Sequence, residues 1–402
     1  MIAISKIIDA KNRLNGVLQN TKLAFAPKLS QITNAKIYVK QENLQNTGSF
    51  KLRGAFNKIS TLSENERQRG VIAASAGNHA QGVAYSAKHY GIEAVIVMPE
   101  ATPLLKVMGV KNLGARAILY GNNYDEAYAY ALNYAKENNL HFIHPFADDE
   151  VIAGQGTIAL EMMSEMESLE SIVVPIGGGG LIAGVASAYK QMFPKVRIIG
   201  VVASGANGMY RSFLSKKIEK TDFVRTIADG IAVRDVNPLN FKYILEGVDE
   251  IVMVDDEEIA NAILFLLENQ KLVVEGAGAS VVAALMHQKF SIKENENIAL
   301  ILSGGNIDVT MLGVIIERGL VRSSRKMRFS VTLIDKPGAL KALTDILTKL
   351  SANIVKIDFD RTSISLVYGD AQVTIMLETK GEEHQELIRN ALRENGYSYT
   401  EI

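Results

Sequence analysis

The segment SIVVPIGGGGLIAGVASAY, Ser171 to Tyr189, contains a β-branched run, then four successive glycines, then a run of small apolar residues. It carries no charge over nearly the length that spans a bilayer, but Pro175 and the glycines at its centre would break a membrane helix. A buried strand, a tight turn and a helix account for the whole pattern. We therefore expect one strand–turn–helix unit of an α/β protein here and no membrane span.

Similar units extend on both sides of this segment, from about residue 70 to 320. Short apolar runs such as EAVIVMP (93–99) and NIALILS (297–303) alternate with helical patterns such as DEAYAYALNYAKENN (125–139). Buried strands that alternate with helices indicate mainly parallel sheets covered on both faces. We expect an α/β domain over residues 1–321, built from two open, mainly parallel sheets, with the smaller subdomain within about residues 50–145.

The pattern changes at the charged stretch RSSRKMR, and we take residues 322–327 as a linker. Beyond it, three segments alternate apolar and polar residues, as half-buried strands do. Their apolar positions are Phe329, Val331 and Leu333, then Val355, Ile357 and Phe359, and finally Val373, Ile375 and Leu377. With two helical stretches between them, residues 328–402 predict a separate ferredoxin-like βαββαβ module.

Composition excludes several function classes. The net charge is -1, from 43 basic and 44 acidic residues, which gives no footprint for nucleic acid or for an anionic membrane. The chain has no cysteine, so disulfides, thiolate nucleophiles and cysteine-bound metals are excluded. The N-terminal segment lacks the uninterrupted apolar core of a signal peptide. We expect a cytoplasmic protein that acts on small molecules.

Three glycine-containing strings follow apolar strands, where ligands meet open α/β sheets. The tetraglycine suits a phosphate held by backbone amides at a helix start, and a tight packing turn is the alternative. SAGNHAQG, Ser75 to Gly82, suits a carboxylate held by the amides of residues 75–78, or it is an ordinary helix cap. LSGGN, Leu302 to Asn306, presents Ser303, or it is a plain turn.

Lys51 lies between Phe50 and Leu52 in NTGSFKLRGAF, at the start of a predicted helix. Desolvation and a helix N-terminus lower the pKa of an amine and make it a nucleophile. Together with a phosphate site, a carboxylate site and a serine hydroxyl, such a lysine indicates a pyridoxal phosphate site. The strings GSFKLRGA, SAGNHAQG, PIGGGGLIAG, IADG and SGGN, in this order, resemble threonine dehydratases (threonine ammonia-lyases) of the tryptophan-synthase-β fold type, also called fold type II.

This resemblance implies a role for each matching residue. Lys51 would hold pyridoxal phosphate covalently and remove the substrate's Cα proton, while Phe50 packs beside the ring, Asn78 binds the phenolic oxygen and Ser303 faces the pyridine nitrogen. The phosphate would be held by Gly177, Gly178, Gly179, Gly180 and Leu181. The substrate carboxylate would be bound by the loop of Ser75, Ala76, Gly77, Asn78 and His79.

The neutral Ser303 hydroxyl makes the ring a weaker electron sink than a carboxylate would, which favours elimination over transamination. The implied reaction converts L-threonine to 2-oxobutanoate and ammonia, with L-serine giving pyruvate. A serine dehydratase or serine racemase remains an alternative, because one methyl group distinguishes the substrates by only ~1–3 kcal/mol. A catalytically silent amino-acid sensor is the alternative from another class.

No metal is expected. Some relatives have a glutamate at the position of Ser204, as part of a cation site, and HFIHPFADDE (141–150) is explained by a turn before a helix. Arg53, Asp229 and Glu275 lie in family-like strings without an assigned role.

The C-terminal string LIDKPGALKALTDIL, Leu333 to Leu347, resembles the opening of an ACT domain, a small amino-acid-binding module. Pro337 suits the first turn of a helix and Gly338 allows close approach of a ligand. The resemblance implies an effector site at an interface between two modules, lined by Asp335, Pro337, Gly338, Ala339, Leu340, Asn353 and Ile354. Isoleucine is the expected effector, in isoleucine biosynthesis, and the expected assembly is a homodimer or homotetramer. A purely structural, dimer-forming module is the alternative.

Overall fold

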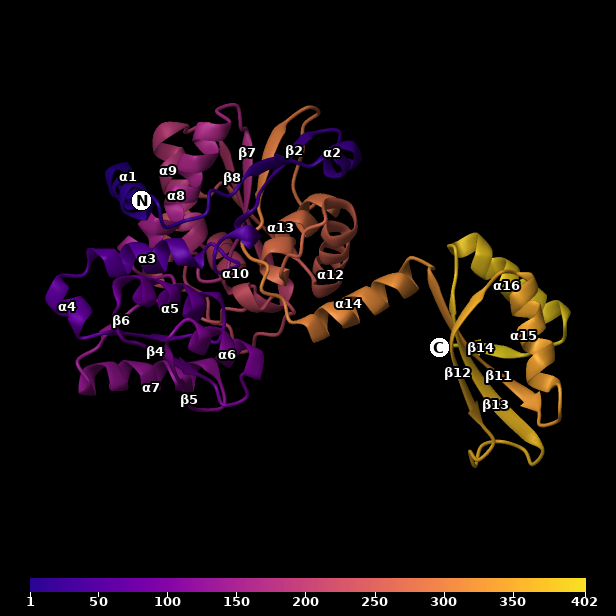
Figure 1. Ribbon diagram of the computed structural model, residues 1–402. Helices are drawn as coiled ribbons and strands as arrows, with labels where there is room; N and C mark the ends of the chain where they lie inside the picture. Colours follow the sequence, from indigo (N-terminus) through magenta and orange to yellow (C-terminus); the bar gives the residue numbers. More distant parts are fainter. The chain divides into compact units, whose positions relative to one another are not determined.

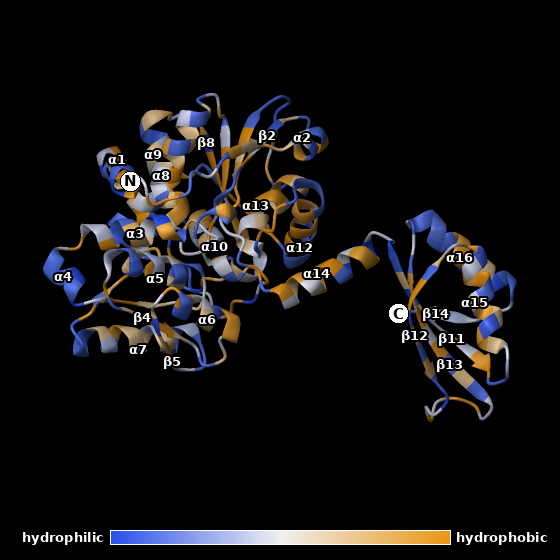
Figure 2. Ribbon diagram, in the orientation of Figure 1, coloured by the Kyte–Doolittle hydropathy of each residue, from blue (hydrophilic) through white to orange (hydrophobic).

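The structure is a computed structural model that describes all 402 residues. It divides into two compact units, Met1–Asp308 and Val309–Ile402, which are coloured from indigo to orange and from orange to yellow in Figure 1. Figure 2 shows that hydrophobic residues are concentrated in buried elements such as α13, whereas the short surface helix α4 is hydrophilic. No helix is long and apolar enough to cross a bilayer.

A six-stranded sheet forms the larger lobe of the first unit, with strand order β1-β2-β10-β7-β8-β9. All neighbouring strands are parallel except the edge pair β1 and β2. The strands are β1 (Leu23–Phe25), β2 (Lys36–Lys40), β7 (Ser171–Pro175), β8 (Arg197–Ala203), β9 (Glu250–Val254) and β10 (Asn297–Ile301). The segment 171–189 forms β7, a glycine turn and α9 (Gly180–Met192), so the strand–turn–helix prediction is confirmed.

Helices cover both faces of this sheet, which is why its strands are continuous apolar runs. One face packs against α1 (Ile4–Leu14), α8 (Asp149–Glu165), α9, α10 (Gly208–Ser215) and α11 (Pro238–Gly247). The other face packs against α13 (Gly276–Met286), which is flanked by α2 (Pro27–Thr33) and α12 (Asp256–Phe265) (Figure 1). Short helical turns complete the lobe: η1 (Glu42–Leu44), η2 (Ser204–Ala206), η3 (Asp229–Ile231) and η4 (Leu266–Gln270).

A four-stranded parallel sheet of order β5-β4-β3-β6 forms the smaller lobe. Its strands are β3 (Val71–Ala74), β4 (Ala94–Met98), β5 (Arg116–Leu119) and β6 (His141–Phe142). Successive residues along these strands face opposite sides of the sheet, with α3, α5 and α6 packed on one side and α7 on the other. The helices are α3 (Lys51–Thr61), α4 (Glu64–Gln68), α5 (Asn78–Tyr90), α6 (Leu104–Asn112) and α7 (Tyr124–Glu137). The predicted α/β architecture with two parallel sheets is confirmed.

Glycines bring three helices into backbone contact where the lobes meet. A Cβ at Gly154 of α8 would lie 2.5 Å from the Arg53 carbonyl oxygen of α3. A Cβ at Gly184 of α9 would lie 2.6 Å from the amide nitrogen of Gly156, also on α8. Contacts this short exclude any side chain at these positions. Helix α8 therefore joins α3, which carries Lys51, to α9, which follows the tetraglycine.

The second unit has the βαββαβ order predicted for it, with sheet order β12-β13-β11-β14 and antiparallel neighbours. Its elements are α14 (Val309–Arg322), β11 (Lys326–Ile334), α15 (Ala339–Lys349), β12 (Asn353–Asp360), β13 (Asp370–Glu378), α16 (Glu382–Glu394) and β14 (Tyr399–Glu401). Contacts group α14 with this unit, whereas the sequence pattern placed the boundary after it, at residues 322–327.

Two expectations for this unit are wrong in detail. Helix α15 begins at Ala339, so Pro337 precedes the helix instead of lying in its first turn. Gly338 has a φ of +90°, which favours glycine, and a Cβ there would meet no atom of this chain within 4 Å. Strand β12 is less buried than its alternating pattern predicts, with Ile357 37% and Phe359 44% exposed. It lies at the edge of the sheet, while the unit's hydrophobic core is built mainly from the other strands and the two helices.

Candidate active site

The three glycine-containing strings lie at the carboxyl ends of parallel strands. SAGNH follows β3 of the smaller sheet, the tetraglycine follows β7, and LSGGN follows β10, the neighbour of β7 in the larger sheet. One hydrogen bond joins two of these strings across the two lobes, since Asn306 Nδ2 of LSGGN donates to Asn78 Oδ1 of SAGNH over 2.7 Å. These two strings, predicted to belong to one site, therefore lie side by side.

Lys51 is half-buried at the first position of α3. Its Nζ donates to the Pro145 carbonyl over 2.9 Å and lies 5.5 Å from the centre of the Phe50 ring. Burial lowers the pKa of the Lys51 amine to about 8, and the negative charge of Glu275 opposes this fall. The amine is therefore partly neutral near physiological pH, as a nucleophile or base must be.

Backbone pairing holds the lysine segment against the end of β10. The Phe50 amide donates to the Ser303 carbonyl over 3.0 Å, and Ser49 forms an isolated antiparallel bridge with Gly304. Ser303 is 1% exposed. Lys51, Phe50 and Ser303 are thus brought together as the resemblance implied.

The tetraglycine has both of the properties considered from the sequence. It is tightly packed: a Cβ at Gly178 would lie 2.4 Å from the Phe146 ring, and one at Gly177 would lie 2.8 Å from Ile231 Cα. It also opens α9, where Gly179 is the N-cap with φ +86° and no side chain caps the helix. The first amides of an uncapped helix start are donors for an anion, so a packing turn and a phosphate site are compatible here.

The SAGNH loop enters α5, with Gly77 as an N-cap that makes no side-chain hydrogen bond. A Cβ at Gly77 would meet no atom within 4 Å, so the space beside it is open. The Ser75 amide already donates to the Val97 carbonyl over 3.1 Å, and Ser75 Oγ accepts from the Gly77 amide over 3.2 Å. Contrary to expectation, Ser75 can therefore offer a ligand its hydroxyl but not its amide.

His79 is buried at the inner end of this loop. Burial lowers the pKa of its imidazole to about 3, and the positive charge of Lys51 lowers it further. The neutral ring has one N–H, and the Ile143 carbonyl, 2.9 Å from Nε2, can only accept it. Nδ1 is therefore an acceptor, and it is buried without a hydrogen-bond partner.

Asn78 belongs to a polar chain that the sequence analysis did not find. Its Nδ2 donates to Glu275 Oε1 over 2.7 Å, and Asn306 Nδ2 donates both to Asn78 Oδ1 and to the Thr47 carbonyl, 2.8 Å away. Burial raises the pKa of the Glu275 carboxyl to about 7, against the hydrogen bond from Asn78. Glu275 lies 197 positions from Asn78, and its only local mark is its place before the helix start at Gly276.

Arg53, unassigned from the sequence, is fully buried two residues after Lys51. Its guanidinium forms two hydrogen bonds to Glu42, two to Glu161 and one to Thr157, between 2.6 and 3.1 Å. Its five N–H groups are thus all used. Lys40 Nζ, also buried, extends the network to Glu161 over 2.8 Å. The network joins α3 to the larger lobe.

The string HFIHPFADDE forms β6, a turn and the start of α8. His144 Nδ1 accepts from the Ala147 amide over 2.8 Å, and Asp148 caps α8 while it pairs with Lys58 over 2.7 Å. Asp229 pairs with Lys106 of α6 over 3.4 Å, and Ser204 begins η2 after β8. These contacts support the turn interpretation of the string.

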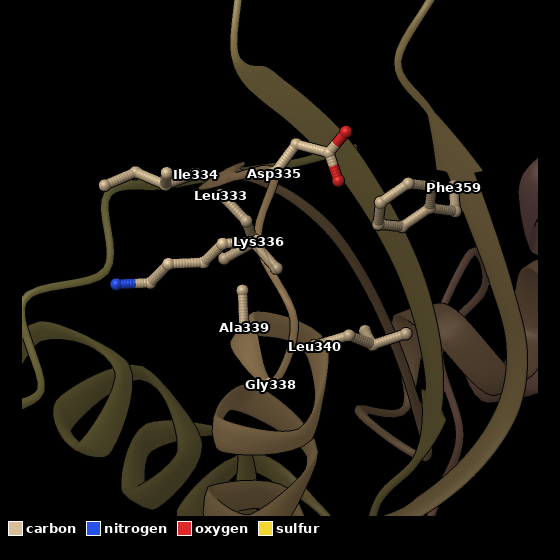
Figure 3. Close-up of a pocket in the computed structure, with 8 residues that line it drawn as sticks. All are labelled: Leu333, Ile334, Asp335, Lys336, Gly338, Ala339, Leu340 and Phe359. Atoms are coloured by element: carbon tan, nitrogen blue, oxygen red, sulfur yellow. The ribbon is translucent and has the colours of Figure 1, made fainter.

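The predicted effector residues lie in the second unit around a cavity of about 310 Å³ (Figure 3). Four of them line it, namely Asp335, Gly338, Ala339 and Leu340. Pro337, Asn353 and Ile354 do not line it, and Phe359 of β12, which the resemblance did not include, does. Figure 3 shows the Phe359 ring of β12 pointing toward Asp335, while the Lys336 side chain extends away from Phe359.

Comparison with known proteins identifies relatives over the whole chain. The family model described as "Pyridoxal-phosphate dependent enzyme" matches residues 14–304. An "L-threonine ammonia-lyase" of Thermotoga maritima is 48% identical over 397 residues, covering 99% of this chain and 98% of that protein. One of the same name from Geobacter sulfurreducens is 45% identical with the same coverage. The solved structure of processed threonine deaminase isoform 2 from Solanum lycopersicum superposes with TM-score 0.75 and 40% identity, covering 78% of this chain and 87% of that one.

Proposed function

This chain belongs to the family of pyridoxal-phosphate-dependent enzymes, and we propose that Lys51 is the residue that carries its cofactor. The enzyme is an ammonia-lyase that converts L-threonine to 2-oxobutanoate and ammonia. The observation that carries the proposal is the half-buried Lys51 amine with its lowered pKa, held by backbone pairing of Phe50 with Ser303 at the end of β10.

The residues around Lys51 fit pyridoxal phosphate. The uncapped start of α9 at Gly177 to Leu181 suits its phosphate, and Phe50 and Lys51 are adjacent as a ring neighbour and an attachment point. Asn78 has a second N–H for the phenolic oxygen, since only one is used by Glu275. The buried Ser303 hydroxyl would face the ring nitrogen.

Held by these residues, pyridoxal phosphate would supply an electron sink for the substrate's α-carbon. The neutral Nζ of Lys51 then accepts the α proton, for which its lowered pKa suits it. The Ser75 hydroxyl and the open space beside Gly77 would receive the substrate carboxylate. Loss of the β-hydroxyl as water, followed by hydrolysis, gives 2-oxobutanoate and ammonia.

Replacing the lysine tests this assignment. We expect Lys51→Ala to abolish both the visible absorption of the bound cofactor and 2-oxobutanoate release, with L-threonine and L-serine assayed side by side. Lys88→Ala, on the exposed side of α5, is the matched control and should keep both. A Lys51→Ala protein that stayed coloured and active would remove the assignment.

We also propose that the second unit is an ACT-type module that binds an amino-acid effector, with isoleucine the first candidate. The cavity lined by Asp335, Ala339 and Phe359 is large enough for an amino acid and offers a carboxylate beside apolar side chains. The partly exposed edge strand β12 suits pairing with a second copy in a homodimer or homotetramer.

The effector proposal predicts that isoleucine lowers the rate of 2-oxobutanoate release at subsaturating L-threonine. A typical coupling of ~1–3 kcal/mol would change affinity by roughly 5- to 150-fold. Asp335→Ala should abolish this response and leave the uninhibited rate unchanged, because Asp335 lies in the other unit from Lys51. A rate that did not respond to isoleucine would exclude it as the effector.

A further inference from the structure

We propose that Glu275 is a positioning residue that holds the Asn78 amide in one orientation, so that its free N–H is directed to the cofactor's phenolic oxygen. This inference rests on the proposed cofactor site. Glu275 touches Asn78 and not the reacting atoms, so it acts through its neighbour.

Hydrogen-bond polarity supplies the main argument. The Thr47 carbonyl can only accept, so it fixes Asn306 with its Nδ2 on that side, and the same Nδ2 donates to Asn78 Oδ1 over 2.7 Å. On the other side, Asn78 Nδ2 donates to Glu275 Oε1 over 2.7 Å. If the Asn78 amide were rotated by 180°, its Oδ1 would face the Glu275 carboxylate and its Nδ2 would face Asn306 Nδ2, so both hydrogen bonds would be lost. One N–H of Asn78 is therefore left over, and its position is determined.

The backbone leaves room for this polar chain at three glycines. A Cβ at Gly304 would lie 2.4 Å from Glu275 Oε1 and 3.2 Å from Asn78 Nδ2, and one at Gly230 would lie 3.2 Å from the same Oε1. At Gly48, which has φ +69°, a Cβ would lie 2.4 Å from Asn306 Oδ1. Larger residues at these positions would displace a member of the chain.

Glu275 itself is used in an unusual way. It is the N-cap of α13, where a side chain commonly bonds the helix's own amides, but here it makes no such bond. Its side chain is 9% exposed and faces Asn78, while its amide donates to the Gly304 carbonyl over 3.0 Å. Burial and the nearby Asp229 charge raise the pKa of the Glu275 carboxyl, so its ionised form is destabilised at this position. A costly carboxylate in contact with Asn78 is consistent with a function there.

The test compares Glu275→Gln, Glu275→Asp and the exposed control Glu294→Gln. Glutamine preserves shape but replaces the charged acceptor with a neutral amide that can present either an oxygen or an NH₂, so Asn78 is then oriented from the Asn306 side alone. Aspartate keeps the charge but is one methylene too short to reach. We expect both Glu275 variants to fold, to retain cofactor on Lys51 and to lose turnover roughly 10- to 100-fold in kcat, with a smaller change in KM.

The second readout is the visible absorption of the bound cofactor as a function of pH. Loss of a directed donor to the phenolic oxygen disfavours its ionised form, so the midpoint of the visible band should shift by about one pH unit in both variants. Glu294→Gln should leave kcat and spectrum unchanged. An unaltered spectrum and kcat in Glu275→Gln would overturn the inference and leave the Lys51 assignment intact. Wild-type protein that binds no cofactor would instead overturn the proposed site.

Discussion

Lys51 has a reactive amine because its surroundings offer it a backbone carbonyl and an aromatic ring but no carboxylate in direct contact. The Pro145 carbonyl accepts its hydrogen bond and Phe50 lies beside it. Glu275 is near enough to limit the fall in its pKa but is bonded to Asn78. The amine therefore loses its proton more easily than an exposed lysine does.

The rate at which the cofactor-free enzyme takes up pyridoxal phosphate should report this pKa. Only the neutral amine reacts, so the rate should increase with pH and level off above about pH 8. A free lysine derivative, as control, should continue to accelerate until about pH 10. The measurement is the growth of visible absorption after rapid mixing, and a rate that still rose steeply above pH 9 would contradict the lowered pKa.

At the scale of single residues, the sequence indicated residues within short marked strings but not the long-range contacts between them. Lys51, Asn78 and Ser303 were found because each lies in a short string with a local mark, a glycine run or a strand end. Asn306 lies in the LSGGN string and Glu275 in a family-like string, but their contacts with Asn78 span 228 and 197 positions, so local patterns did not show that these side chains pair. The Ser75 amide was misjudged for a related reason, since β4 supplies the carbonyl that occupies it.

At the scale of elements, α3 is held in place by charge as well as by packing. Arg53 connects it to η1 through Glu42, a pair fully removed from water, and to α8 through Glu161, whose side chain is 18% exposed. Strand and helix positions could be predicted from apolar periodicity, because the spacing of apolar residues within an element reflects which of its faces is buried. The edge position of β12 could not, because it depends on which strands the helices α15 and α16 cover.

Arg53→Met should lower the free energy of unfolding by about 3–5 kcal/mol, because it leaves the fully buried Glu42 carboxylate without its cationic partner. Arg69→Met, on an exposed turn after α4, should change it by less than ~0.5 kcal/mol. Denaturant titration of both variants measures the difference. A loss below about 1 kcal/mol for Arg53→Met would mean that water reaches the carboxylates and replaces the guanidinium.

At the scale of the whole molecule, the proposed cofactor site and the proposed effector cavity lie in different units. Every residue of the proposed cofactor site precedes Asp308, and every residue of the proposed effector cavity follows Val309. The hydrophobic cores of the two units share no residue.

A chain that ends at Asp308 should therefore keep the visible absorption and the turnover of L-threonine but lose any response to isoleucine. The full-length Asp335→Ala variant is the companion, since it removes a cavity carboxylate without removing the unit. Inhibition of the shortened chain by isoleucine would place the effector site in the first unit. Thermal melts of both proteins establish that a lost response is not a lost fold.

The glycine contacts among α3, α8 and α9 have a consequence for how such an enzyme diverges. Since main chain touches main chain at Gly154 and Gly184, the separation of α3, α8 and α9 at these points is set by the backbone and not by the length of a side chain. Mutations in the loops that hold the substrate can accumulate without disturbing that spacing. A lineage built on this frame is free to exchange one amino acid for another as its substrate while it inherits the cofactor geometry unchanged.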